Sequence, residues 1–321
     1  MTNRPLVSFM VIAYRQDRFI RKVVRSVLAQ TYEPLEIILS DDCSPDRTFD
    51  IMREEVEAYR GPHKIVLNRN DANLGVSGHI NRVWELSTGE MLIAGAGDDI
   101  AYPQRASSLV SKWLETNKEA DIVTCSHYDV LNDCGGIIAR RRPSAIYMPN
   151  TEEHYSKWKC GVTGACAAYA RRVYEGTGPL DPMVIAEDNV YPFWVWLRGG
   201  IVAIVQEVLL GKITNDENLH RVFASINSAK LRKDRKRLRV RAANDALARS
   251  REWLRFARKG PHCRGSELVG RLEQLVRLRT NQRQCLDAGI LKAVQLAGDT
   301  LLSTGCIKHS AGVLLRGWGV Y

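Results

Sequence analysis

The chain has 321 residues, of which 45% are hydrophobic and 26% charged, a composition typical of a globular protein with a sizeable core. Its length allows one large domain, or one domain with an appendage. The net charge of +10 is local, because residues 230–264 carry 14 Lys and Arg against 3 Asp and Glu, which excludes a chain that is basic throughout.

Strands and helices are predicted to alternate over the first hundred residues. Short apolar runs predict buried strands, and apolar residues three and four apart predict helices with one buried stripe. In chain order these are a strand at 7–13, a helix at 19–28, a strand at 35–39, a helix at 46–59, a strand at 65–67, a helix at 76–86 and a strand at 91–94. The alternation predicts a mostly parallel sheet with helices on both faces.

Two pairs of acidic residues follow strands of this sheet. Asp41-Asp42 comes after the second strand, and Asp98-Asp99 comes after the fourth. Sheets of this kind bind ligands beyond the carboxyl ends of their strands. We therefore expect the two acidic pairs to lie on one rim.

The pattern is less regular from residue 121. It predicts a strand at 121–125, a hairpin turn at Gly135-Gly136, a short helix within 187–198 that begins near Pro192, and strands at 202–205 and 208–213. From residue 216 the chain is basic, with helices predicted around 231–253, 268–276 and 286–301. This change of character divides the chain into a domain at 1–215 and a basic helical region at 216–321.

The eight cysteines show no C-x-x-C pair and no zinc-finger spacing with histidine. They indicate reduced thiols in a cytosolic protein. No secretory signal is recognised at the N-terminus, and no stretch reaches about 18 apolar residues. The expected location is the cytoplasm, with peripheral attachment to the cytoplasmic face of the inner membrane as the alternative.

The pair Asp98-Asp99 is the first candidate for chemistry. Two carboxylates at a strand end, with glycines just before them, suit a hard divalent cation that also holds a diphosphate. Mg²⁺ and Mn²⁺ take oxygen ligands and keep positions open for phosphate oxygens. The pair alone fits a solvated turn equally well.

Two further acidic sites also have a structural alternative. Asp42 can accept a hydrogen bond from a base N–H or cap a helix. Asp46 is the better candidate for the cap, which leaves Asp42 uncommitted and available for another role. Glu187 and Asp188 can be catalytic carboxylates, or acids that complement a helix dipole.

The segment at 7–48 resembles the opening of family 2 glycosyltransferases. That family has an apolar strand, Tyr-Asn, a helix ending Ser-Val-Leu-x-Gln-Thr-Tyr, and a strand followed by Asp-Asp-x-Ser-x-Asp-x-Thr. The matching residues here are Tyr14, Ser26-Val27-Leu28, Gln30-Thr31-Tyr32 and 41–48 (DDCSPDRT). Later matches in order are Asn73-Leu74-Gly75, Asn81, Gly89, Asp98-Asp99, Glu187-Asp188 and Arg198, so the resemblance covers about 7–213.

The resemblance implies a fold and an activity. The fold would be GT-A, a Rossmann-like mixed α/β sheet flanked by helices, with a nucleotide-binding half at 1–100, an acceptor-binding half at 101–215 and the C-terminal helices as an extension. The activity would be inverting transfer of one sugar from a nucleotide-diphosphate sugar, most often of UDP, with Mn²⁺ or Mg²⁺. The acceptor would be a saccharide or lipid-linked saccharide in bacterial surface polysaccharide biosynthesis.

The resemblance also implies roles for residues. Asp99 would bind the metal, Asp188 would be the general base, and Glu187 would orient the base or the acceptor. The nucleotide-sugar site would comprise Ala13, Tyr14, Asp42, Asn73, Gly75 and Asp98. The acceptor would lie against Gly164, Ala165, Trp194 and Arg198, although a place in the helix core is the alternative for Trp194.

Several features depart from the family pattern. Arg15 replaces the usual Asn, and His79-Ile80 stands where an Arg often precedes the Asn. His79 can replace a nucleotide contact or be a satisfied histidine on a helix face, and we favour the helix-face interpretation. The Gln-x-x-Arg-Trp signature of processive synthases is absent, which favours the transfer of a single sugar.

The basic segment Lys230–Lys259 has three interpretations: a solvated helix face, a contact with an anionic membrane surface, or a nucleic-acid site. No nucleic-acid partner is expected, because no recognised module accompanies the charge. Two other functions compete with the transferase. One is an inactive GT-A scaffold that uses its basic tail, and the other is a nucleotidyltransferase, which needs a Gly-rich triphosphate loop that is missing after the first strand.

Overall fold

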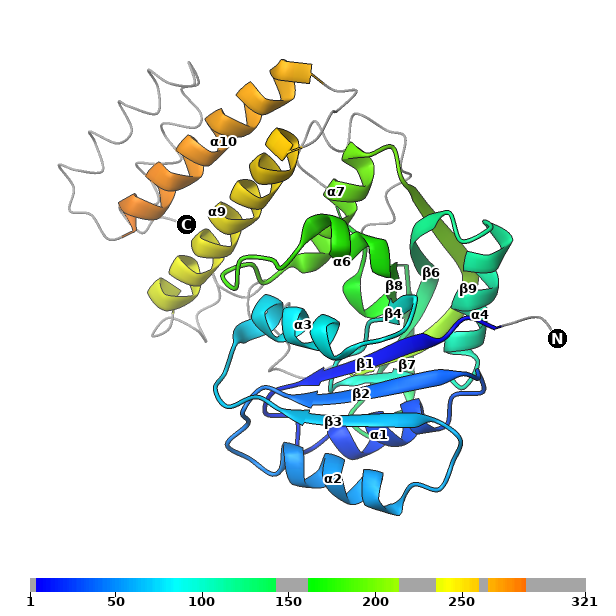
Figure 1. Cartoon of the computed structure of the whole chain (residues 1–321). Coiled ribbons are helices and arrows are strands. Elements are labelled where there is room, and N and C mark those ends of the chain that lie inside the picture. The colour runs from blue at the N-terminus through cyan, green and yellow to red at the C-terminus, as the bar shows by residue number, and fades with distance from the viewer. Residues whose placement is uncertain (1–3, 143–160, 214–234, 260–264, 287–321) are drawn as a thin grey trace. The chain divides into compact units, whose positions relative to one another are not determined.

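The computed structural model describes residues 4–142, 161–213, 235–259 and 265–286. The chain divides into two compact units, Met1–Asn215 and Asp216–Tyr321. One sheet with helices on both faces forms the larger unit (Figure 1). In the smaller unit, helices α9 (Arg235–Lys259) and α10 (Gly265–Cys285) pack against each other. None of the described helices is long and apolar enough to cross a membrane.

The sheet is mixed but mainly parallel. Its strands are β1 (Val7–Ala13), β2 (Leu35–Asp41), β3 (Lys64–Arg69), β4 (Met91–Ile93), β5 (Asp99–Ala101), β6 (Ala120–Leu131), β7 (Ile137–Arg141), β8 (Ala167–Ala170) and β9 (Ile201–Ile213). They are ordered β3-β2-β1-β4-β8-β6-β9-β5, and β7 pairs with β6. Strands β5, β7 and β8 run against the others. The carboxyl ends of the parallel strands therefore share one edge.

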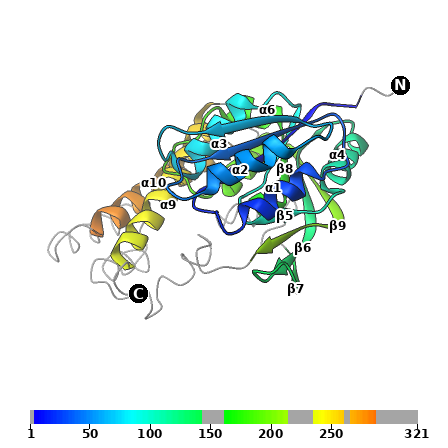
Figure 2. The ribbon, with the colours of Figure 1, turned by 90° about the horizontal axis from the view of Figure 1, so that it is seen from below.

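Helices cover both faces of the sheet (Figures 1 and 2). They are α1 (Ile20–Leu28), α2 (Thr48–Ala58) and α4 (Arg105–Glu115) on one face, and α3 (Gly75–Leu86), α6 (Arg171–Thr177) and α7 (Tyr191–Leu197) on the other. Two 3₁₀ turns, η1 (Gly164–Cys166) and η2 (Glu187–Asn189), complete the unit.

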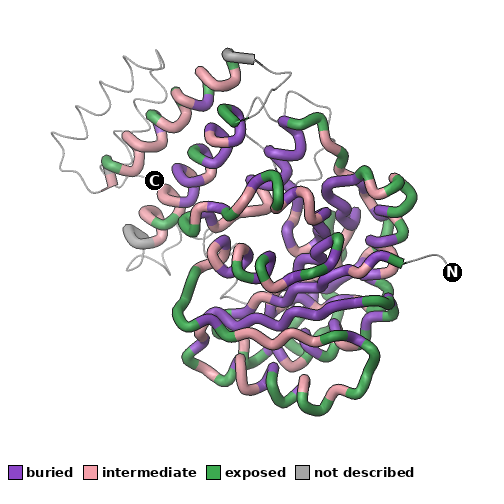
Figure 3. Tube along the Cα trace, viewed as in Figure 1, coloured by how far each residue is buried: buried purple, intermediate pink, exposed green. Residues whose placement is uncertain are grey.

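The core lies on both sides of the central strands, which are buried along their length (Figure 3). Alternate strand residues, such as Phe9 and Ile37, pack against Val24 of α1, and all three are fully buried. On the opposite face, Trp84 of α3 stacks on Tyr174 of α6 with ring centroids 5.1 Å apart. Because these strands are buried on both faces, their sequences are unbroken apolar runs rather than alternating apolar and polar residues.

Every strand and helix predicted in the first hundred residues is present, and the predicted turn at Gly135-Gly136 joins β6 to β7. The strands predicted at 202–205 and 208–213 are one strand, β9, and the strand predicted at 121–125 extends to Leu131. The helix predicted within 187–198 is η2 followed by α7, with Pro192 in the first turn. The helix predicted at 286–301 lies outside the described residues apart from its first position.

Four elements were not predicted: β5, α4, β8 and α6. Strands of three and four residues, such as β5 and β8, are too short to show a period. The signal for α4 was present, because Ala106, Leu109, Val110 and Trp113 follow helical spacing and are all buried.

Candidate active site

The loops after β2 and β4 flank the end of β1. Asp42 N donates to Ala13 O over 2.9 Å, and Gly97 N donates to Ile12 O over 2.9 Å. The close approach requires a glycine, since a Cβ at Gly97 would lie 2.9 Å from the Ala13 Cβ. The prediction that the two acidic pairs share one rim is confirmed.

Asp99 begins β5 and faces the protein interior. It is 3% exposed, and the Nζ of Lys212 on β9 lies 3.3 Å from its Oδ1. Within the described residues neither carboxylate oxygen accepts a hydrogen bond, so this ion pair balances its charge. Burial lowers the pKa of Lys212, but the carboxylates of Asp99 and Asp98 outweigh burial and raise that pKa above its ordinary value.

Asp98 is the more accessible member of the pair, being half-buried. Its carbonyl accepts a hydrogen bond from Ile213 N over 3.0 Å, which fixes the loop to the end of β9. No cluster of three or more His, Cys, Asp or Glu converges among the residues that the structure describes. The two carboxylates nevertheless fit Mg²⁺ or Mn²⁺, which keeps several ligand positions for water and phosphate. Of the two carboxylates, Asp98 is the more exposed and Asp99 the more buried.

Asp42 is already engaged in this structure. Its Oδ1 accepts hydrogen bonds from Asn70 Nδ2 over 2.8 Å and Leu74 N over 2.9 Å, and its Oδ2 accepts one from Gly75 N over 3.0 Å. Asp42 therefore caps the start of α3, while Asp46 caps α2 by accepting from Thr48 N. The expectation that the Asp46 cap leaves Asp42 uncommitted is wrong. A carboxylate has about four acceptor positions, three of which are used here, and Asp42 is 3% exposed.

Asn73 and Gly75 shape the same loop. The side-chain amide of Asn73 donates to Asp42 O over 3.3 Å, and Gly75 has a φ of +72°, which favours glycine. Both residues thus lie beside Asp42, as expected for one site. The structure gives them a role in holding the loop.

Tyr14 follows β1 and is 41% exposed, which leaves an aromatic face at the rim. The next residue, Arg15, has a φ of +57°, and its guanidinium carbon lies 5.5 Å from the Tyr14 ring centroid. Asn is the residue type most tolerant of this left-handed backbone after glycine. The backbone therefore explains the Asn that the resembled family has here, and Arg15 adopts the same conformation without it.

His79 on α3 is buried beneath this loop, as predicted. Its Nε2 lies 2.6 Å from Ser40 Oγ, within hydrogen-bond distance, and the residue is 3% exposed. Burial lowers the pKa of His79 to about 4, against the opposing effect of the nearby Asp42 carboxylate. The histidine is therefore neutral at pH 7.

The burial of neutral His79 predicts a pH dependence of stability. The unfolded chain binds this proton near pH 6.5 and the folded chain near pH 4, so stability is complete above pH 6.5 and falls as the pH drops to 4. The loss attributable to His79 is about 3 kcal/mol. Urea unfolding at pH 7 and pH 4.5 checks it, with His79→Gln as the control that lacks this proton. Equal pH slopes for the two proteins would contradict the assignment.

Glu187 and Asp188 meet the segment before β8. Asp188 Oδ2 accepts a hydrogen bond from Gly164 N over 3.1 Å, and Asp188 Oδ1 accepts one from Asn189 Nδ2 over 2.8 Å. A Cβ at Gly164 would lie 2.8 Å from Glu187 Oε1. The small residue at 164 therefore makes room for the two acids. Both acids are half-buried, so they stay accessible to solvent.

Arg105, which sequence reasoning missed, connects the end of β4 to the segment beside Asp188. Its buried guanidinium donates to Ala94 O and Ala165 O, both over 2.6 Å, and lies 5.1 Å from the centroid of the Phe9 ring. Burial lowers the pKa of the Arg105 guanidinium, and the charge of the Asp99 carboxylate opposes that effect. Arg105 thus ties the segment that carries Gly164 and Ala165 to the end of β4.

Trp194 and Arg198 do not lie at this rim. Trp194 is 7% exposed and fills the space beside Gly176, and the Arg198 guanidinium carbon lies 4.5 Å from the Trp194 ring centroid. Arg198 precedes the start of β9, whereas Lys212 lies at its end, roughly 40 Å along an extended strand of that length. The prediction that these two side chains contact the acceptor is wrong for the described conformation, and the helix-core alternative holds for Trp194.

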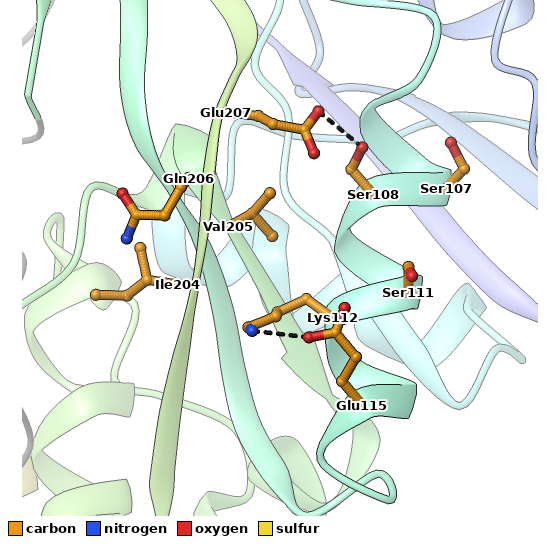
Figure 4. A pocket seen from close by; sticks show the side chains of 9 residues that line it. All are labelled: Ser107, Ser108, Ser111, Lys112, Glu115, Ile204, Val205, Gln206 and Glu207. Atoms are coloured by element: carbon orange, nitrogen blue, oxygen red, sulfur yellow. Dashed lines mark hydrogen bonds and ion pairs between the residues drawn. The ribbon is translucent and has the colours of Figure 1, made fainter.

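A hollow of about 490 Å³ lies between α4 and β9 (Figure 4). None of the predicted site residues lines it. Its charged side chains are engaged locally, with Ser108 Oγ 3.1 Å from Glu207 Oε2 and Lys112 Nζ 2.8 Å from Glu115 Oε2. The chemistry therefore points to the rim rather than to this hollow.

Residues 8–178 match the model of the family described as glycosyl transferase family 2. The putative glycosyltransferase EpsE of Bacillus subtilis is 29% identical over 123 residues, which are 38% of this chain and 43% of EpsE. WcaA of Escherichia coli, a putative colanic acid biosynthesis glycosyl transferase, is 31% identical over 107 residues, 33% of this chain and 37% of WcaA. The match spans less than half the length of either relative.

A solved structure supports the fold. The mannosyltransferase PcManGT from Pyrobaculum calidifontis, in complex with GDP-Man and Mn²⁺, gives a TM-score of 0.57 at 16% identity and covers 99% of this chain and 88% of that chain. At this identity the likeness concerns the fold. The predicted GT-A fold is confirmed.

Proposed function

Because the chain belongs to glycosyltransferase family 2, we propose that it transfers one sugar, with inversion, from a nucleotide-diphosphate sugar to a saccharide or lipid-linked saccharide. The observation that supports the proposal is that Arg105 ties the segment beside Asp188 to the end of β4, shortly before Asp98. Asp98 lies beside the end of β1, and Asp188 is bonded to Gly164, in the segment that Arg105 ties to β4.

The donor nucleotide is proposed to lie across the ends of β1 and β2. Tyr14 offers an exposed ring for the base, and Asp42 is the proposed acceptor for a base N–H. Ala13, Asn73 and Gly75 shape the walls, and Asp98 lies on the side of the ribose and diphosphate. The base that fits is left to experiment, with UDP as the first candidate.

A divalent ion, Mn²⁺ or Mg²⁺, is proposed to be held by Asp98, with Asp99 behind it. When bound, such an ion neutralises charge on the departing diphosphate. The chain contributes oxygen ligands and a fixed orientation, because the ion pair with Lys212 and the bond from Ile213 N hold the two aspartates in place.

Asp188 is proposed to act as the general base. The acceptor oxygen forms a bond to the anomeric carbon as the bond from that carbon to the diphosphate oxygen breaks, and the hydroxyl proton passes to Asp188. The hydrogen bonds from Gly164 N and Asn189 Nδ2 fix the orientation of the carboxylate. Glu187 shares the small space at Gly164, which suits a positioning role.

The biological setting proposed is surface polysaccharide biosynthesis, the role named for WcaA. A reducing compartment such as the cytoplasm is supported by the free thiols Cys43, Cys125, Cys134 and Cys166. We also propose that the nucleotide half is 1–100 and the acceptor half 101–215.

A thermal-shift panel of nucleotide sugars with Mn²⁺ tests the proposal. The expected result is a rise in melting temperature of about 5 °C or more for sugars of one base, since a saturating ligand stabilises the folded state. Asp98→Asn should lose the part of the rise that needs Mn²⁺. Binding without turnover would support the inactive scaffold instead. No rise with any nucleotide-diphosphate sugar would overturn the proposal.

A further inference from the structure

The ends of β6 and β7 form a hairpin at one end of the sheet of the larger unit (Figure 2). Residues 132–138, here called the hairpin tip, are exposed at every position. Ile137 and Ile138 are 61% and 60% exposed, more than any other large apolar side chain described. The register of β6 and β7 shifts at this point, so the two isoleucines lie at a β-bulge beside the turn.

Five cations lie on the segments next to the hairpin tip. They are Arg140, Arg141 and Arg142 on β7 and just beyond it, and Arg18 and Lys22, just before and within α1, which both bond to Asp133. Two carboxylates oppose them, since Asp133 pairs with Arg18 and Asp129 pairs with Arg140, each over 2.9 Å. Five cations against two carboxylates leave an excess of three positive charges around an exposed apolar pair.

This combination matches the chemistry of a membrane surface. Apolar side chains enter the boundary between head groups and acyl chains, and the surrounding Arg and Lys attract anionic head groups. A second copy of the same patch would be repelled by the like charges. An anionic lipid surface is therefore the occupant that the patch fits.

The hairpin tip is directly continuous with the candidate active site. Val130 of β6 pairs with Lys212 of β9, and Lys212 pairs with Asp99 of β5. Leu131, the last residue before the hairpin tip, packs with Phe19 and Ile213. The site and the hairpin tip therefore share one rigid row of strands.

The described part of the basic tail fits this role less well. Arg249 pairs with Asp245, Arg255 with Glu252, and Arg258 with Glu273. These charges are engaged within the smaller unit, where α9 and α10 pack together. The tail thus offers fewer unengaged charges than its composition suggests.

We propose that the hairpin tip docks the protein on an anionic lipid surface and holds the rim of the active site there. The role of this docking in sugar transfer rests on the proposed function, because a lipid-linked acceptor resides at such a surface. The docking itself needs no catalysis, so the docking proposal and the proposed function can be tested separately.

Vesicle co-sedimentation of the full chain tests the docking. Binding is expected to phosphatidylcholine vesicles that contain phosphatidylglycerol, but not to phosphatidylcholine alone, and to weaken as salt screens the charges. Ile137→Ser with Ile138→Ser, and separately Arg141→Gln with Arg142→Gln, should each weaken binding about tenfold or more. Ile201→Ser, an exposed isoleucine at the far end of β9, is the matched control and should bind as wild type.

Cys134 provides a second readout, because it is an exposed thiol in the hairpin tip. An environment-sensitive fluorophore on Cys134 should shift to the blue on anionic vesicles, and Cys134→Ser should lose that signal. Unchanged binding by the Ile137/Ile138 variant with unchanged melting temperature would overturn the proposal, as would loss of binding only in Arg251→Gln with Lys259→Gln on α9. Transfer to a water-soluble acceptor, measured in the same variants, reports separately on the proposed function.

Discussion

Replacing Asp188 by asparagine is expected to lower kcat by about 10²- to 10⁴-fold, the usual contribution of a general base. The change is nearly isosteric, and an amide oxygen can still accept the hydrogen bond from Gly164 N. The loop and the donor site should therefore remain intact. Steady-state kinetics at saturating acceptor should show the loss in kcat, with KM for the nucleotide sugar and the melting temperature close to wild type.

Glu187→Gln is the matched control for this prediction. Glu187 lies beside Gly164 with its neighbour Asp188, so the same kind of change tests position without removing the proposed base. We expect a smaller loss, shared between kcat and the acceptor KM. If Asp188→Asn keeps about a tenth or more of wild-type kcat while Glu187→Gln does not, the base is Glu187.

The rim itself was predictable because it depends on local patterns. Apolar runs that alternate with helical stripes specify parallel strands, and parallel strands place the residues that follow them at one edge. Asp42 and Asp98 could be assigned to that edge without knowledge of any side-chain contact. The order of the strands was not needed for this step.

The contacts within the rim were not predictable, because they join distant segments. Lys212 reaches Asp99 through pairing of a three-residue strand with the end of β9, and such a short strand has no period. Asp42 is engaged by donors from the loop at 70–75, whose conformation depends on Gly75. Local signals describe neither arrangement.

Trp194 and Arg198 show how nearness in sequence misleads. Both follow Asp188 by ten residues or fewer, and the family resemblance placed them with it at the acceptor. The helix α7 carries the chain away from the rim to the start of β9, and β9 then returns to it. Arg105 was missed for the opposite reason, because nothing local indicates that an arginine will be buried against two distant carbonyls.

Lys212→Met is expected to lower the free energy of unfolding by about 2–4 kcal/mol. Asp99 is fully buried and its oxygens accept no hydrogen bond from the described residues, so removing the ammonium leaves a buried charge without its contact partner. A third of the Lys212 side chain is exposed, and water that reaches the pair keeps the loss below the largest values for buried pairs. Urea unfolding at pH 7 measures the loss, and Lys212→Arg should restore most of it.

Adding Asp99→Asn to Lys212→Met should recover most of this stability, because the double variant has no buried charge left at the pair. The double variant also tests which of the two aspartates binds the metal. If Asp98 is the direct ligand, Mn²⁺ titrations followed by electron paramagnetic resonance should show binding by the double variant in the presence of nucleotide sugar, and lost binding in Asp98→Asn. Binding that is lost in the double variant and retained in Asp98→Asn would assign the metal to Asp99. In that case the ion must displace Lys212 from Asp99, since one carboxylate oxygen already lies 3.3 Å from the ammonium.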